Sequence, residues 1–218
     1  MTALRVLALN CTLKPSPGAS STELIARQVL ELFEADGAET ELVRVVDHDV
    51  KPGVEADMGD GDEWPAIREK LLAADILLFA TPTWVGHPSS IAQRVIERLD
   101  AEISETDAAG RPLLAGKVAA VAVVGNEDGA HAIVADVLQA LVDVGFSVAS
   151  QASTYWNGEA MGRVDYQDLP GTPESVATTN AAVARHSAHL ARLLRDAPYP
   201  PPAWSRRAPA PTPTPECA

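Results

Sequence analysis

The chain has 218 residues, of which 46% are hydrophobic and 5% aromatic, and its formal net charge at pH 7 is −13. This length and apolar content predict one ordinary domain with a full core, and the negative charge argues against nucleic acid or an anionic membrane as a partner. The two cysteines, Cys11 and Cys217, are too few for a disulfide framework or a cysteine metal site, so we expect a reducing, cytoplasmic compartment and no metal ion.

The chain begins with a short apolar run, residues 4–9, which predicts a buried strand rather than a processed leader. A polar loop follows, and then an amphipathic helix over residues 20–36. This order of elements forms an anion pocket, because the free N–H groups and the positive end of the helix dipole face the loop. The side chains that can add hydrogen-bond donors or positive charge there are Thr12, Lys14, Ser16, Ser20, Ser21 and Thr22.

The same loop also has a purely structural interpretation. Ser20 and Glu23 have the spacing of a capping box, which accounts for two polar residues without any ligand. The loop is not a P-loop, because no Gly-Lys-Ser/Thr closes it, and it lacks the G-x-G-x-x-G motif. Phosphate binding and simple helix capping therefore both stay open on this stretch alone.

Apolar and amphipathic segments continue to alternate further along the chain. Residues 75–80 and 118–124 are apolar at consecutive positions, as expected of central parallel strands covered on both faces. Residues 41–46 alternate like an edge strand, and residues 147–152 predict a shorter last strand. The remaining helices are expected at residues 65–73, after Pro88, between His131 and Gly145, and from Thr172 to about Arg195. Polar connections are expected at residues 47–63, 101–116 and 153–171.

Strands that alternate with helices predict an α/β domain with a parallel, doubly wound sheet over residues 1–197. From residue 198 onward the composition changes to Pro with Ala and Thr, which predicts an extended, flexible tail over residues 198–218. No run of the sequence approaches the roughly 18 apolar residues that a membrane span needs.

In such a sheet the loops that follow the strands meet at one edge, where ligands bind. The loop after residues 75–80 offers backbone N–H groups and one large aromatic ring, and the next loop has glycines that let its backbone approach a ligand closely. The last loop brings Tyr155 and Trp156. Together with a phosphate pocket, these features predict a planar mononucleotide, and FMN in particular. The residues of the first two of these loops are Pro82, Thr83, Trp84, Val85, Gly86, Gly125, Asn126 and Gly129.

Each loop taken alone has a plainer explanation. Trp84 and Trp156 can cap or fill the core, and the glycines can be turn residues only. His87 and His131 lack a third ligand at metal spacing, so we interpret them as surface or cap residues. The agreement of several loops on one ligand favours the mononucleotide.

Three stretches, the loop 10–22, the segment Ala74–Gly86 and the loop Gly125–Gly129, resemble the flavodoxin-like NADPH-dependent FMN reductase family. That family includes flavin-dependent quinone and azo reductases and the iron–sulfur flavoproteins. The resemblance covers residues 3–195, and its most specific part is the segment Asp75–Gly86 with its Ala-Thr-Pro-Thr-Trp-Val-Gly ending. It implies a three-layer sandwich with a five-stranded parallel sheet in the order 2-1-3-4-5.

The resemblance also implies a set of FMN contacts. Around the phosphate it places Thr12, Lys14, Ser20, Ser21 and Thr22; along the ring edge Pro82, Thr83, Trp84, Val85 and Gly86; and on the far side Gly125, Asn126 and Gly129. The chemistry of the last loop adds Tyr155 to the predicted contacts. Two departures matter. The first loop reads Asn-Cys-Thr-Leu-Lys-Pro-Ser-Pro-Gly instead of the shorter turn of the family, so the resemblance does not assign individual phosphate contacts. The cysteine cluster of iron–sulfur flavoproteins is missing, so no cluster is expected.

These expectations favour an FMN-dependent oxidoreductase in which NAD(P)H delivers hydride to the flavin N5 and a quinone, flavin or similar acceptor takes the electrons. The cofactor carries this chemistry, so no acid–base residue is assigned. One alternative is a flavodoxin-type electron carrier that meets a protein partner through its acidic surface, and another is a non-catalytic binding module. The resemblance further implies a homodimer or a higher homo-oligomer.

Overall fold

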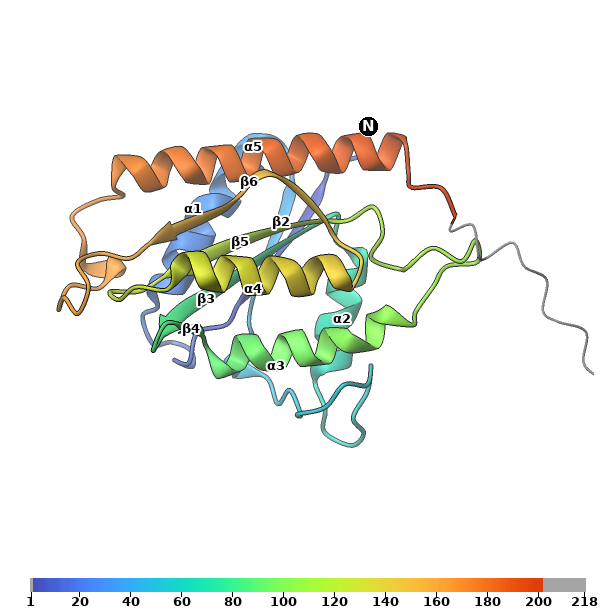
Figure 1. The fold of residues 1–218 in the computed structure, drawn as a ribbon, viewed down its shortest axis with the longest axis horizontal. Coiled ribbons are helices and arrows are strands. Elements are labelled where there is room, and N and C mark those ends of the chain that lie inside the picture. Colours follow the sequence, from blue (N-terminus) through green and yellow to red (C-terminus); the bar gives the residue numbers. More distant parts are fainter. Residues whose placement is uncertain (1, 202–218) are drawn as a thin grey trace, which may run out of the picture.

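The computed structural model describes residues 2–201 (Figure 1). Its strands are β1 (Arg5–Asn10), β2 (Glu39–Arg44), β3 (Ile76–Trp84), β4 (His87–Pro88), β5 (Val118–Val124) and β6 (Ser147–Trp156). Its α-helices are α1 (Ser21–Ala35), α2 (Trp64–Ala73), α3 (Ser90–Leu99), α4 (Ala130–Asp143) and α5 (Glu174–Asp196). Short 3-10 turns occur at η1 (Val45–Asp47), η2 (Asp100–Ile103) and η3 (Tyr166–Asp168).

Five of the strands form a parallel sheet in the order β2-β1-β3-β5-β6, and the two-residue β4 pairs antiparallel with the end of β3. Because β4 lies off this path, the main strands have the predicted order 2-1-3-4-5, which is that of the flavodoxin-like doubly wound fold. The predicted fold class is therefore confirmed. The winding direction reverses between β1 and β3, and this switch point is where such folds bind ligands.

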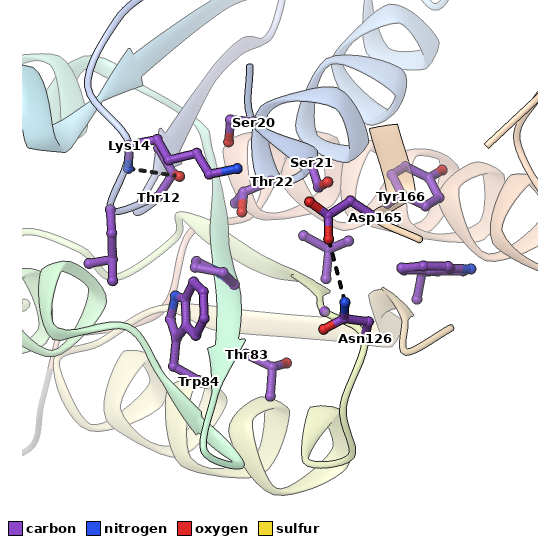
Figure 2. Close-up of a pocket in the computed structure, with 15 residues that line it drawn as sticks. Thr12, Lys14, Ser20, Ser21, Thr22, Thr83, Trp84, Asn126, Asp165 and Tyr166 are labelled. Atoms are coloured by element: carbon purple, nitrogen blue, oxygen red, sulfur yellow. Dashed lines mark hydrogen bonds between the residues drawn. The ribbon is translucent and has the colours of Figure 1, made fainter. Parts of the chain in front are cut away.

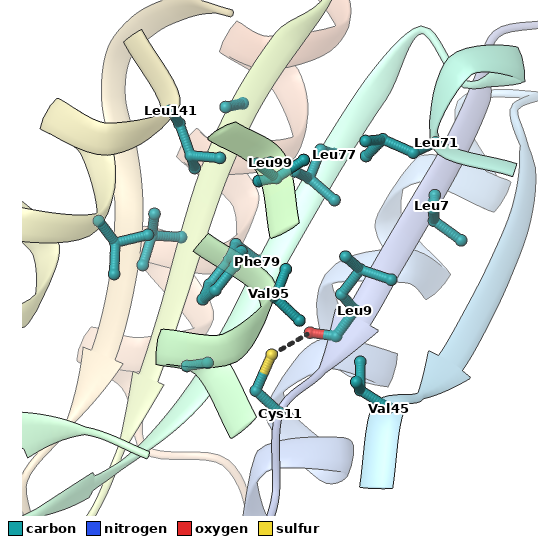
Figure 3. Close-up of a cluster of buried hydrophobic side chains, with 14 of the residues drawn as sticks. Leu7, Leu9, Cys11, Val45, Leu71, Leu77, Phe79, Val95, Leu99 and Leu141 are labelled. Carbon is teal, nitrogen blue, oxygen red and sulfur yellow. Dashed lines mark hydrogen bonds between the residues drawn. The ribbon is translucent and has the colours of Figure 1, made fainter. Parts of the chain in front are cut away.

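Helices cover both faces of the sheet, which makes the three expected layers (Figure 1). One face packs against α2, α3 and α4, in a core that includes Leu9, Phe79 and the fully buried Cys11 (Figure 3). The other face packs against α1 and α5. All seven residues of β5 are buried, because both faces of this central strand are covered, and this explains its uninterrupted apolar sequence.

Two strands are longer than the sequence pattern predicted. β3 continues to Trp84 instead of ending at residue 80, because Thr81 and Pro82 still pair with β5. β6 continues to Trp156 instead of ending at residue 152, because its polar second half also pairs with β5. In β6 the register shifts near Gln151, which has a positive φ of 55°, so a bulge divides the strand.

The last helix ends near the predicted residue, and residues 198–201 continue without regular structure. The rest of the predicted Pro-rich tail, with Cys217, lies outside the described residues. Within residues 2–201, no helix combines the length and the apolar character that crossing a bilayer requires.

A buried ion pair secures the long connection between η1 and α2. The Arg98 Nη2 lies 2.8 Å from the Asp62 Oδ2, and both side chains are fully buried. The same guanidinium donates to two backbone carbonyls of the connection and lies 5.7 Å from the centre of the Trp64 ring. Burial by itself would raise the pKa of Asp62, but hydrogen bonds from Arg98 and from backbone amides hold that pKa well below its usual range.

We expect the substitution Arg98→Met to lower the free energy of unfolding by about 3 kcal/mol, because it leaves the Asp62 carboxylate buried without a counter-charge. Chemical denaturation at neutral pH measures this loss. The matched control is Arg192→Met, which breaks an exposed pair with Asp36 and should cost less than about 1 kcal/mol.

The pH dependence of this loss follows from the lowered pKa. The stabilisation by Asp62 is present above an unfolded-state pKa of about 4 and disappears as the pH falls through the lower folded-state pKa. The difference between wild type and Arg98→Met should therefore shrink in acid. Equal losses for the two arginine variants at neutral pH would contradict the interpretation.

Candidate functional site

A pocket of about 570 Å³, part of it open to solvent, lies at the edge of the sheet where β1, β3, β5 and β6 end (Figure 2). Its position is the switch point between β1 and β3, where folds of this kind bind their ligands. The residues that line it are Thr12, Leu13, Lys14, Ser20, Ser21, Thr22, Pro82, Thr83, Trp84, Val124, Gly125, Asn126, Trp156, Asp165 and Tyr166.

The first turn of α1 forms the polar end of this pocket. Ser20 is the N-cap, and its hydroxyl accepts from the Glu23 N–H at 3.2 Å. The amides of Ser21 and Thr22 have no partner in the part of the chain described, and Figure 2 shows the Lys14 side chain reaching toward this turn. Unpaired N–H groups, hydroxyls, an ammonium and the helix dipole together favour an anion here.

Only half of the predicted capping box forms. The Glu23 carboxylate does not turn back to the cap but pairs with Arg27 and Arg44. Burial by itself would raise the pKa of Glu23, and the two guanidinium groups outweigh it and lower that pKa. The carboxylate at the start of α1 is thus neutralised by arginines and does not cancel the positive field of the helix end.

Arg44, at the end of β2, organises the whole first loop. Besides pairing with Glu23, its Nη1 donates to the carbonyls of Lys14 at 3.2 Å and Gly18 at 2.8 Å. A second tie joins Ser16 to Asp47, whose carboxylate accepts from the Ser16 amide at 2.8 Å and from its hydroxyl at 2.6 Å. Hydrogen bonds from Ser16 lower the pKa of Asp47. The loop is therefore held from outside and can present its donors to the pocket.

The middle of the pocket is a flat wall made by the ends of β3 and β5. Pro82, Thr83 and Trp84 line it from one strand, and Gly125 lines it from the next. A Cβ atom on Gly125 would lie 2.8 Å from the Thr83 Cβ, so only glycine lets the two backbones approach this closely. The Thr83 hydroxyl is buried and unpaired within the described residues, which leaves a hydrogen bond for a ligand to complete.

The far wall comes from residues 156–169, a segment from which we predicted only aromatic rings. The Asn126 Nδ2 donates to the Gly162 carbonyl at 2.8 Å, and the Asn126 carbonyl accepts from the Met161 amide at 2.7 Å. Tyr166 packs against Trp156 with ring centroids 5.4 Å apart, and burial raises its pKa. This wall adds Trp156, Asp165 and Tyr166 to the pocket.

Most of the predicted contact residues meet in this pocket, but four do not line it. Val85 has 85% of its surface exposed and points outward, with its amide bound to the Glu127 carboxylate at 3.0 Å. Gly86 and Gly129 pack directly on each other beside the wall. Tyr155 lies on the opposite face of β6, where its hydroxyl is 3.0 Å from the His131 Nε2. Of the two neighbouring aromatic residues, Trp156 and not Tyr155 faces the pocket.

Asp165 and Tyr166 were missed because nothing in their local sequence marks them. They follow β6 by about ten residues in an irregular connection, and their place at the pocket depends on long-range ties. The Tyr166 hydroxyl donates to the Gln28 side chain at 2.6 Å, and the Gln167 amide donates to the Ser21 hydroxyl at 3.3 Å. Polar residues in a long loop after the last strand are the only signal that was available.

The donor set suits a phosphorylated planar ligand. A helix turn with unpaired N–H donors stands at one end, an unpaired hydroxyl and a glycine-lined wall stand in the middle, and aromatic rings stand at both sides. A phosphate, a polar linker and a flat ring match this order of chemistry along the pocket. The residues present therefore fit a flavin mononucleotide.

Comparison with known proteins agrees with this chemistry. A family model described as NADPH-dependent FMN reductase matches residues 4–160. The chain is 36% identical over 209 residues to the 8-demethyl-8-aminoriboflavin-5'-phosphate synthase of Streptomyces davaonensis, covering 90% of this chain and 80% of that protein. It superposes with a TM-score of 0.82 and 35% identity on RosB bound to 8-demethyl-8-formylriboflavin-5'-phosphate, over 90% of this chain and 82% of that one.

A third relative extends well beyond the length of this chain. It is a Mycobacterium bovis protein named divalent metal cation transporter MntH, 35% identical over 227 aligned positions. The match covers 96% of this chain but only 33% of that protein.

We expect Arg44→Met to loosen residues 12–20, because three contacts to the loop and to Glu23 are lost together. Hydrogen exchange should show faster exchange of the loop amides, and the free energy of unfolding should fall by about 1–3 kcal/mol. Arg27→Met is the matched control, since Arg27 pairs with the same carboxylate but is mostly exposed and touches no loop carbonyl. Unchanged loop exchange in Arg44→Met would show that the loop holds its shape alone.

Proposed function

The chain belongs to the NADPH-dependent FMN reductase family, and from this premise we propose that it moves electrons from NAD(P)H through FMN to a quinone, a flavin or a similar small acceptor. At the coarser level it is a flavin-related oxidoreductase. The observation that carries the proposal is the pocket itself, in which an anion-binding helix end and a flat wall lie at the ligand edge of the sheet.

The phosphate would be held by the first turn of α1. The amides of Ser21 and Thr22 donate to its oxygens, and the hydroxyl of Thr22, which is 2% exposed, adds a short-range donor. Lys14 contributes a positive charge from the first loop. Because Arg44 holds this loop in place, the donors are oriented before the ligand arrives, which lowers the entropic cost of binding.

The ring would lie along the ends of β3 and β5. Gly125 gives the space for a close approach, the unpaired Thr83 hydroxyl can complete its hydrogen bonding, and Trp84 covers one side. Bound FMN supplies the acceptance of hydride at N5 and the onward transfer of electrons, and the protein supplies position and electrostatics. We assign no side chain as a general acid or base.

The mouth of the pocket suits a flat, apolar acceptor. Leu13 and Trp84 line the pocket and are 42% and 50% exposed, and the neighbouring Val85 and Met161 are 85% and 86% exposed. These side chains come from three separate loops. A quinone or a second flavin ring that settles on them removes apolar surface from water, which favours its binding. The carbonyl or ring nitrogen atoms of such an acceptor would take up the electrons and protons.

Two other functions have specific support. The acidic surface supports a flavodoxin-type carrier that meets a protein partner. The 36% identity to a synthase named for an aminoriboflavin phosphate supports a role in which FMN is the substrate instead of the cofactor. The same phosphate and ring contacts would serve a reductase, an electron carrier and an enzyme that uses FMN as its substrate. A homodimer or higher homo-oligomer, and a cytoplasmic location, remain proposals drawn from the family resemblance and the cysteine content.

We expect the purified protein, after addition of FMN, to show oxidised-flavin absorption bands that NADPH bleaches without any added reductase. A quinone should then restore the bands, because it removes the electrons, and the mass of the extracted flavin should be unchanged. Bleaching that needs a separate reductase would favour the electron carrier, and a changed flavin mass would favour modification of the flavin. A colourless protein that does not quench FMN fluorescence would overturn all three.

We expect Thr22→Val to raise the dissociation constant for FMN about tenfold, because the substitution removes a buried hydroxyl donor to a charged phosphate at nearly constant volume. The dissociation constant for riboflavin, which has no phosphate, should stay the same. Fluorescence quenching titrations measure both. The control variant is Thr178→Val on the exposed face of α5. Equal losses for the two flavins would contradict the placement of the phosphate at α1.

A further inference from the structure

The pocket contains one charged side chain, Asp165, that neither suits a phosphate nor makes a hydrogen bond on which the fold depends. Asp165 precedes η3 in the position of a helix cap, yet its carboxylate makes no capping hydrogen bond. Its one contact to a side chain in the described residues is to the Asn126 Nδ2, at the outer limit of 3.5 Å. Figure 2 shows this carboxylate pointing into the pocket between Ser21 and Asn126.

The Asp165 carboxylate is not needed to keep its own loop in place. Asn126 already binds the Gly162 carbonyl at 2.8 Å with the same amide nitrogen and accepts from the Met161 amide at 2.7 Å. The loop is tied to α1 by separate hydrogen bonds, from the Tyr166 hydroxyl and from the Gln167 amide. The carboxylate is therefore free to bind a ligand.

The pocket consequently has a donor end and an acceptor end. Around the first turn of α1 stand amides, hydroxyls and the Lys14 ammonium, which donate. Beside them stand the Asp165 carboxylate and the Asn126 Oδ1, which accept. Within residues 2–201 the carboxylate accepts one side-chain hydrogen bond, from the Asn126 Nδ2 at 3.5 Å, and the Asn126 Oδ1 accepts none. A phosphate, which only accepts, is repelled by the acceptor end. Any group bound there must present O–H or N–H.

Because η3 is tied to the start of α1, Asp165 stands beside the phosphate end and across from the flat wall of β3. In a flavin mononucleotide, the donors that lie next to the phosphate are the hydroxyls of the ribityl chain. We propose that Asp165, together with the Asn126 Oδ1, accepts hydrogen bonds from the ribityl hydroxyls. These hydrogen bonds favour binding of flavins that carry the ribityl chain. The assignment rests on the proposed function and names one specificity-determining residue of that site.

The test compares three probes by fluorescence quenching: FMN, riboflavin, which has the ribityl chain without the phosphate, and lumiflavin, which has the ring alone. In Asp165→Ala we expect the dissociation constant for riboflavin to rise about tenfold, since a charge-assisted hydrogen bond is lost. The dissociation constant for lumiflavin should be unchanged. Asp165→Asn, which keeps an acceptor oxygen, should recover part of the riboflavin affinity.

Asp168→Ala, which removes an exposed carboxylate from the same η3 turn, is the matched control and should change none of the three constants. Riboflavin affinity that does not change in Asp165→Ala would overturn the assignment. Parallel losses for riboflavin and lumiflavin would also overturn it, because they mean that the carboxylate acts on the ring or on the loop. In either of these two outcomes the proposed function still stands as long as the wild-type protein binds FMN. Wild-type protein that binds none of the three probes would overturn both the Asp165 assignment and the proposed function.

Discussion

The pairing of β3 with both β1 and β5 is the constraint on which the rest of the molecule depends. These strands are buried on both faces, so their interior positions are apolar and carry no chemistry. Polar residues are confined to the points where the strands leave the core. Because the strands are parallel and the crossovers right-handed, those points gather at one edge. The pocket lies at this edge because the core excludes polar groups from the interiors of β1, β3 and β5.

An acidic protein that binds an anion has to overcome its own charge. The net charge of −13 disfavours any phosphate at long range, yet the start of α1 provides a local positive field that acts over a few ångströms. Glu23 in the first turn would weaken this field, but Arg27 and Arg44 neutralise it. Arg44 also donates to two carbonyls of the first loop, so one side chain contributes both to the electrostatics of the start of α1 and to the geometry of the loop before it.

The central part of the fold was predictable because its signals are local. Continuous apolar runs identified β3 and β5, and the strand–loop–helix order predicted that the start of α1 would line a pocket. The second half of β6 was not predictable, because its polar residues become a strand only through pairing with β5. The bulge around Gln151 adds three residues to β6, since Ala119 pairs with Val148 but Val121 pairs with Ser153, and this odd number inverts which face the following side chains point to. No pattern in the sequence could therefore tell whether Tyr155 or Trp156 faces the pocket, and Asp165 depends on contacts even farther apart in the chain.

The same pocket can hold FMN either as a cofactor that stays bound or as a substrate that is released after each turnover. The proposed contacts to the phosphate and the ribityl chain would fix orientation, but they would be equal for a cofactor and for a substrate, so they do not determine which one FMN is. That difference arises at the ring, where the protein offers glycines, one hydroxyl and apolar side chains and no charged group from β3 or β5. A wall of this kind suits electron transfer across an exposed ring edge, because it neither donates nor withdraws protons. Covalent change at the ring would need a reactive group brought by a second substrate, and the exposed apolar mouth at Trp84 and Met161 is where such a molecule would have to bind.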